Sequence, residues 1–183
     1  MRFTAVVVVG LALILPAPLA LAKHLPPPAT PITVPAPSPL LMYQPKERDF
    51  SIGFPGAPKT SFRMLMDGRE RVYMDNEGDR LFMVTATSFL FGAKTDQAAY
   101  DRRLKRFGEN ADATLVSSQR LIWGGEQGCE GVFTTAQGNL VLVRLLVHEK
   151  RLYQAVFWGR GGAGGQDAEE GGAFLESFRL GSR

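Results

Sequence analysis

Residues 140–158, LVLVRLLVHEKRLYQAVFW, contain two apolar runs on either side of a polar centre. The first run, 140–147, is rich in Val and Leu, and the second, 152–158, contains Tyr, Val, Phe and Trp. Both compositions favour β-strands. The tetrapeptide His148-Glu149-Lys150-Arg151 between them is polar and suits an exposed hairpin tip. The stretch therefore predicts two neighbouring antiparallel strands, on which the remaining elements must pair or pack.

Outward from this hairpin, apolar runs separated by Gly, Asp and Asn turns recur along most of the chain. The dipeptide Asp67-Gly68 is the strongest short hairpin signal, because it suits the two-residue turns that join antiparallel strands. The run LFMVTATSFLF, residues 81–91, is apolar on both faces and is typical of a central strand. The pattern predicts strands over 49–54, 61–66, 70–75, 80–91, 114–123 and 129–135.

Two segments have helical patterns instead. In residues 95–108, Tyr100, Leu104 and Phe107 recur at helical spacing, with Thr95 suited to the N-cap and Gly108 to the C-terminal end. Residues 167–178 form the second predicted helix, although its two adjacent glycines each cost about 1 kcal/mol relative to alanine. The order of four strands, a helix, four strands and a helix predicts an α+β fold, an antiparallel sheet with flanking helices.

The N-terminus has the order of a secretory signal peptide. Arg2 precedes an apolar run over 3–15, two prolines follow, and Ala20-Leu21-Ala22 provides small residues for cleavage. We therefore expect residues 1–22 to be a signal peptide and the protein to be periplasmic or secreted. The alternative is an uncleaved membrane anchor, since 20 apolar residues can span a bilayer. No later stretch is apolar for long enough, so we expect no membrane span after cleavage.

The next segment is rich in proline. Residues 25–45 contain eight prolines, which favour an extended and solvated chain. We expect a flexible Pro-rich spacer over 23–47 and a single α+β domain over 48–183.

Composition and motifs exclude several classes of function. The net charge of +3 is too small to indicate nucleic-acid binding. Neither HExxH nor CxxC occurs, so we expect no metal or other cofactor, and G-x-S-x-G is absent as well. Cys129 has no second cysteine with which to form an intrachain disulfide. It is interpreted as a buried residue, or otherwise as a redox site, and pairing with His148 would make a Cys-dependent envelope enzyme the remote alternative.

A basic cluster and two tryptophans form the candidate interaction surface. The cluster lies on the predicted helix 95–108 and suits an anionic surface or an acidic partner, or else is an ordinary solvated helix face. The tryptophans end two predicted strands and could rim a groove between sheet and helix. The six residues are Arg102, Arg103, Lys105, Arg106, Trp123 and Trp158.

Three segments resemble small bacterial exported domains of the PsbP and Mog type. They are DFSIGFPG at 49–56, RLYQA at 151–155 and FLESFRL at 174–180. The resemblance covers roughly residues 48–180 and implies a central antiparallel sheet sandwiched by helices. It also implies an accessory or docking role, as in the extrinsic subunit of photosystem II and a Ran-binding transport factor. No functional motif of those members is present, so no site residue follows from the resemblance.

We therefore expect a non-catalytic accessory or protein-binding domain of the bacterial envelope, with a protein partner there. The alternative is a binder of a small apolar ligand or lipid.

Overall fold

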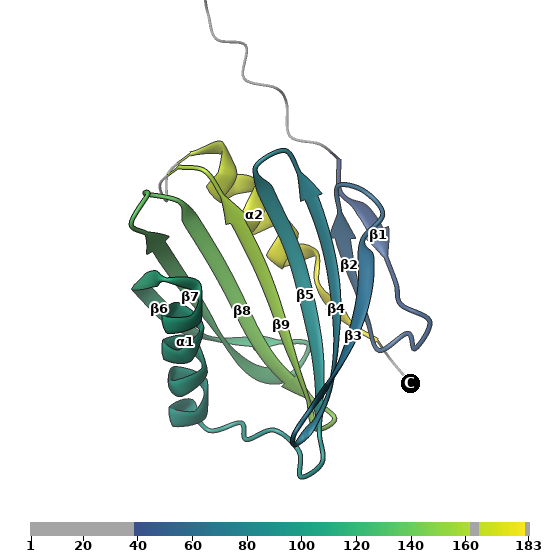
Figure 1. The fold of residues 1–183 in the computed structure, drawn as a ribbon. Helices are drawn as coiled ribbons and strands as arrows, with labels where there is room; N and C mark the ends of the chain where they lie inside the picture. The colour runs from purple at the N-terminus through teal and green to yellow at the C-terminus, as the bar shows by residue number, and fades with distance from the viewer. Residues whose placement is uncertain (1–38, 162–164, 182–183) are drawn as a thin grey trace, which may run out of the picture. The chain divides into compact units, whose positions relative to one another are not determined.

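The computed structural model describes residues 39–161 and 165–181. Its centre is a seven-stranded antiparallel sheet in the order β3-β4-β5-β9-β8-β7-β6 (Figure 1). The predicted hairpin at 140–158 is β8 and β9, which lie near the middle of this sheet. The seven strands are β3 (Lys59–Leu65), β4 (Gly68–Glu77), β5 (Arg80–Phe89), β6 (Ala113–Trp123), β7 (Glu126–Thr135), β8 (Leu140–His148) and β9 (Arg151–Gly159).

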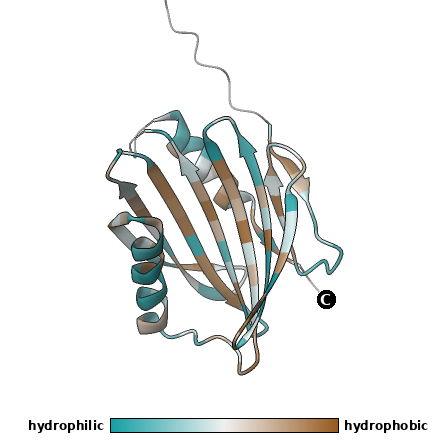
Figure 2. Ribbon diagram, in the orientation of Figure 1, coloured by the Kyte–Doolittle hydropathy of each residue, from teal (hydrophilic) through white to brown (hydrophobic). Residues whose placement is uncertain are grey.

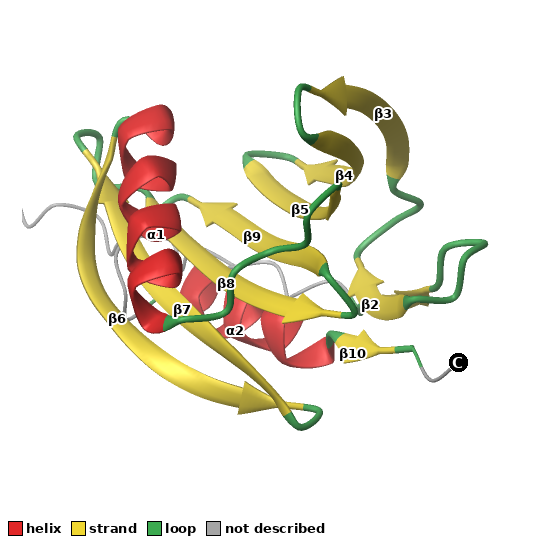
Figure 3. Ribbon diagram, turned by 90° about the horizontal axis from the view of Figure 1, so that it is seen from below, coloured by secondary structure: helices red, strands yellow, loops and turns green. Residues whose placement is uncertain are grey.

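Two helices and a small second sheet cover the large sheet. Helices α1 (Gln97–Ala111) and α2 (Gln166–Ser177) lie on opposite faces of it (Figure 3). The small sheet has the order β1-β2-β10, with β1 (Leu41–Tyr43), β2 (Phe50–Phe54) and β10 (Arg179–Leu180). The predicted α+β class, an antiparallel sheet with flanking helices, is confirmed.

The large sheet buries apolar side chains on both faces. The α2-side core is aromatic, and the α1-side core is mostly aliphatic. Strands β5, β8 and β9 are accordingly hydrophobic along much of their length (Figure 2). Burial on both faces explains why residues 81–91 and 140–147 read as nearly continuous apolar runs rather than as alternating ones.

The three segments of the resemblance meet in the α2-side core. Phe50, Tyr153 and Phe178 pack against one another, with ring centroids 5.7–5.8 Å apart. Beside them, Asp49 accepts hydrogen bonds from Arg151 at 2.5 Å and from the Tyr153 hydroxyl at 3.2 Å. These residues join β2, β9 and the end of α2, so their role in this structure is to hold the fold together.

Helix α1 is longer than its predicted range and begins at a different cap. Asp96, rather than Thr95, is the N-cap, and its carboxylate accepts a hydrogen bond from the Ala99 backbone N–H at 2.7 Å. The helix continues through Gly108 and ends at Asp112, which adopts the left-handed conformation with φ of 50°. Gly108 is needed for packing instead, since a Cβ there would lie 3.1 Å from the Phe133 ring.

Two short strands were absent from the prediction. Strand β1 lies in the stretch assigned to the Pro-rich spacer and pairs with β2, while β10 follows α2 and pairs with the other edge of β2. Residues 1–38 lie outside the described residues, and with them the predicted signal peptide and most of the predicted spacer. Within 39–161 and 165–181, no helix combines the length and hydropathy that crossing a membrane would require.

Candidate functional site

A groove of about 640 Å³ runs between α1 and strands β3–β5, and we call it the α1–β3 groove. It exists because β3 and β4 curl toward the side of the sheet that α1 occupies (Figure 3). Helix α1 packs on β6 and β7 at the far edge of the sheet, so it leaves this part of the face uncovered.

The floor of the α1–β3 groove is polar as well as apolar. Glu70 on β4 is 8% exposed and forms an ion pair with Arg63 on β3. The Thr87 hydroxyl on β5 donates a hydrogen bond to Glu70 Oε1 at 3.1 Å. Thr85 lies one alternate position along β5 and also lines the groove. These three polar residues are buried, and Glu70 is satisfied by Arg63 and Thr87, so the floor beneath the groove is polar but carries no unpaired charge.

The helical wall of the groove carries two residues of the predicted basic cluster, Arg103 and Arg106. Arg103 donates to the Lys94 carbonyl at 2.8 Å, and its guanidinium lies 5.8 Å from the centroid of the Tyr100 ring. Burial lowers the pKa of Arg103, although the group stays cationic at any physiological pH. Arg106 is exposed and makes no ion pair with the described residues. The wall therefore presents positive charge to whatever occupies the groove.

The remaining members of the basic cluster face elsewhere. Arg102 is exposed and does not line the groove, and Lys105 reaches Glu109 one helical turn away at 4.0 Å. The cluster is therefore divided by the helix into a groove-facing pair and a solvated pair.

The two tryptophans cannot rim one groove, because they lie on opposite faces of the sheet. Trp123 packs against the α2-side core, and its indole N–H donates to the Phe178 carbonyl at 2.8 Å. Its ring is flanked by the guanidinium groups of Arg144 at 4.2 Å and Arg179 at 5.4 Å. Trp158 packs against the α1-side core instead. The prediction of a shared aromatic rim is wrong, since strand alternation directs the two side chains oppositely.

Cys129 and His148 are also separated by the sheet. Cys129 is fully buried in the α1-side core, while His148 pairs with Arg151 across the β8–β9 hairpin on the other face. Burial, followed by the charge of Asp101, raises the pKa of the Cys129 thiol to about 12. The partner of His148 is Glu126 rather than the thiol, since His148 Nδ1 lies 2.9 Å from Glu126 Oε1. No Cys–His nucleophile is formed, and Cys129 is a small buried core residue.

A second cavity of about 500 Å³ lies between the start of α1 and strands β6 and β7. Its lining mixes Tyr100, Leu121 and Ile122 with Arg120 and Gln127. In the described part of the chain no group of His, Cys, Asp and Glu is arranged to hold a metal ion.

Sequence reasoning missed the floor of the groove. Glu70, Thr85 and Thr87 appeared only as polar positions within predicted strands. The alternation of side chains along β4 and β5 could have indicated these residues, because it places them on the sheet face that elsewhere carries the apolar α1-side core. What it could not reveal was that α1 stops short of them.

Comparison with solved structures identifies the fold. No protein-family model matches the chain, and no curated protein sequence matches it. The solution structure of CyanoP, the cyanobacterial PsbP of Synechocystis, superposes with a TM-score of 0.55 and 12% identity, over 79% of this chain and 94% of CyanoP. A crystal structure of a protein from Bacteroides thetaiotaomicron gives a TM-score of 0.40 and 15% identity, over 78% of this chain and 48% of that one. The chain therefore has a PsbP-like fold, as the three segments predicted.

Proposed function

We propose that this protein is an exported, non-catalytic accessory domain of the bacterial envelope that binds an acidic segment of a protein partner in the α1–β3 groove. The observation that carries the proposal is the pair Arg103 and Arg106 on the helical wall of the groove. The PsbP-like fold, shared with CyanoP, supports the accessory role, since the three segments resemble a family that includes extrinsic and docking proteins.

The dimensions and chemistry of the groove suit an extended peptide. Its length follows β4 and β5, and Thr85 and Thr87 line its floor at alternate positions along one strand, the Thr87 hydroxyl already bonded to Glu70. Arg63 already neutralises Glu70, so the arginines on α1 remain available to a partner's carboxylates. Charge-assisted hydrogen bonds of this kind are about twice as strong as neutral ones.

Site-specific crosslinking in cells tests the proposal. A photoreactive amino acid at Asn110, which is exposed and lines the groove, should capture a reproducible protein neighbour. The matched control is the same amino acid at Gln137, exposed in the turn between β7 and β8. Arg106→Glu should reduce the yield from Asn110, whereas Arg102→Glu should not. Capture of the same proteins from both positions, or of none from Asn110, would refute the binding site.

Export is tested separately. The mature protein should be recovered from the periplasmic or secreted fraction with Lys23 as its first residue. Soluble cytosolic protein that retains Met1 would contradict export and leave the groove proposal to the crosslinking result.

A second candidate, the binding of a small apolar ligand or lipid, rests on the cavity lined by Tyr100, Leu121 and Ile122. Its volume of about 500 Å³ lies in the range of small-molecule sites. Native mass spectrometry of the purified protein should then show a copurifying mass. Bare protein at every stage of a gentle purification would eliminate this candidate.

A further inference from the structure

Three large apolar side chains project into solvent at one end of the sheet, and we call them the apolar tip: Met66, Leu90 and Phe91. Their exposed fractions are 104%, 74% and 96%. Met66 lies in the turn between β3 and β4, and the other two follow β5. The Leu90 backbone N–H donates to the Asp67 carbonyl at 2.8 Å, which holds the two loops side by side.

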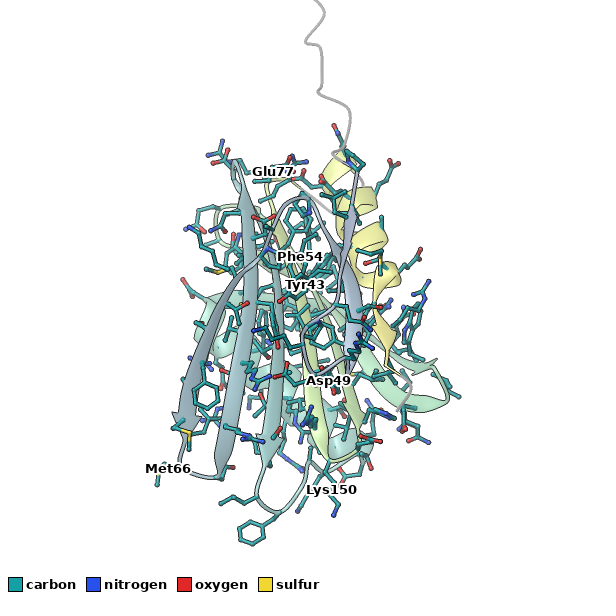
Figure 4. The ribbon with its side chains drawn as sticks, turned by 90° about the vertical axis from the view of Figure 1, so that its right-hand side faces the viewer. Tyr43, Asp49, Phe54, Met66, Glu77 and Lys150 are labelled. Atoms are coloured by element: carbon teal, nitrogen blue, oxygen red, sulfur yellow. The ribbon has the colours of Figure 1, made fainter. Side chains whose placement is uncertain are left out.

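The apolar tip lies at the end of the sheet opposite the β4–β5 turn. Figure 4 shows Met66 at this end, with Lys150 at the same level and Glu77 at the far end. The loop after β5 is hydrophobic at this position (Figure 2). Met64, one alternate position before Met66 on β3, is a further exposed apolar side chain at 73%.

Cations surround the tip. The Lys150 side chain passes close to the loop after β5, since a Cβ at Gly92 would lie 3.5 Å from its Cβ and Cγ. Lys94 in the same loop and Arg69 beside the β3–β4 turn are exposed as well. Among the acidic groups at this end, Asp96 caps α1, Asp49 pairs with Arg151, and Glu126 contacts His148. Arg69, Lys94 and Lys150 then stand against Asp67 and Glu149, so cations are in excess around the tip. Lysine and arginine have long apolar stems, which let the charge reach a headgroup while the stem lies along buried apolar surface.

We propose that the apolar tip inserts into the surface of an anionic lipid membrane and so orients the domain on it. Three separate side chains on two loops present a projecting point rather than a flat patch. A lipid surface needs no complementary shape, and anionic headgroups match the surrounding lysines.

This membrane contact is independent of the partner bound in the α1–β3 groove. Met66 borders the groove, but Leu90 and Phe91 do not line it. Substitutions at these two positions therefore separate the two proposals.

A site-specific fluorescent probe tests the insertion. The mature chain beginning at Lys23, without the apolar leader that could itself bind lipid, carries Met66→Cys labelled with an environment-sensitive dye, while buried Cys129 does not react. On vesicles of phosphatidylglycerol and phosphatidylcholine in equal parts, the emission should shift to the blue. The same dye at Val116→Cys is the matched control, since Val116 is 62% exposed on β6 and lines neither the groove nor the cavity. Its emission should not change.

The composition of the tip is tested in the same assay. Leu90→Ser with Phe91→Ser should weaken the vesicle-induced shift at position 66 by at least about tenfold in lipid concentration. Lys94→Glu with Lys150→Glu should weaken it too, whereas Lys105→Glu, exposed on α1, should not. Vesicles of phosphatidylcholine alone should give a weaker shift.

Three results would overturn the proposal. They are no shift at position 66, an equal shift at positions 66 and 116, and a shift that survives loss of both Leu90 and Phe91. Equal shifts on anionic and neutral vesicles would refute its electrostatic part.

Discussion

Replacing Gly171 with alanine should destabilise this protein, whereas the same replacement at the adjacent Gly172 should stabilise it. Both glycines lie inside α2, where alanine is favoured over glycine by about 1 kcal/mol. Helix propensity alone therefore predicts equal gains at the two positions.

Packing separates them. A Cβ at Gly171 would lie 2.7 Å from Cγ of the Phe157 ring and 2.9 Å from Leu142 Cδ1, while a Cβ at Gly172 meets nothing within 4 Å. Phe157 is fully buried and packs edge-on against Phe82, with ring centroids 5.2 Å apart, so it has no room to withdraw.

Overpacking of this kind costs up to about 3 kcal/mol. Net of the propensity gain, Gly171→Ala should lose about 2 kcal/mol, and Gly172→Ala should gain about 1 kcal/mol.

Equilibrium unfolding in urea measures both free energies directly. The variants should differ by about 3 kcal/mol, with shifts of opposite sign relative to the parent protein. Phe157→Val provides the control, because the smaller side chain makes room for a methyl group at position 171. In that background the cost of Gly171→Ala should shrink. Shifts of the same sign for Gly171→Ala and Gly172→Ala would refute the reasoning that α2 approaches β9 through Gly171.

The other two predictions concern buried ionisable groups. Cys129 should not react with a thiol reagent at pH 8 in the native protein, because burial raises its pKa to about 12, and it should react fully in denaturant; rapid labelling under native conditions would contradict its place in the core. Arg80→Gln should destabilise the protein more at pH 8 than at pH 5. Burial raises the pKa of Glu170, and Arg80, its ion-pair partner, lowers it. Without the Arg80 cation, the pKa of Glu170 in the folded protein rises further. The variant therefore keeps its stability at low pH, where Glu170 is protonated, and loses stability as the pH increases through that pKa. Urea unfolding at both pH values measures the loss. Arg160→Gln, which removes an exposed pair with Asp79, is the control, and an equal loss at both pH values for Arg80→Gln would exclude the mechanism.

The long strands and both helices were predictable because their signals are local. Asp67-Gly68 marks the β3–β4 hairpin, but the two turn residues are Met66 and Asp67, because Gly68 already pairs with Leu65. Glycine is required at 68 for packing instead, since a Cβ there would collide with the Ser88 carbonyl. The stripe of Tyr100, Leu104 and Phe107 does face the sheet. Strands β1 and β10 could not be predicted, because two or three residues have no periodicity, and both depend on pairing with β2.

The candidate site was predictable only in part. The basic residues were identified, but which of them share a groove depends on where α1 lies across the sheet. Trp123 and Trp158 were grouped because each ends a strand beside glycine. Their opposite orientations follow from the register of the assembled sheet, which the residues next to them in the sequence do not indicate.

Strand β10 has a consequence for the stage of synthesis at which the domain can complete its folding. It pairs with β2, and Phe178 just before it stacks on Phe50, so residues from the two ends of the domain close the same aromatic cluster. Phe178 is synthesised only after every strand of the large sheet has been made. Until Phe178 is synthesised, Phe50 lacks its stacking partner, and the nascent chain exposes an apolar surface to which a chaperone can bind. A premature stop codon anywhere upstream of Phe178 would leave that surface permanently open.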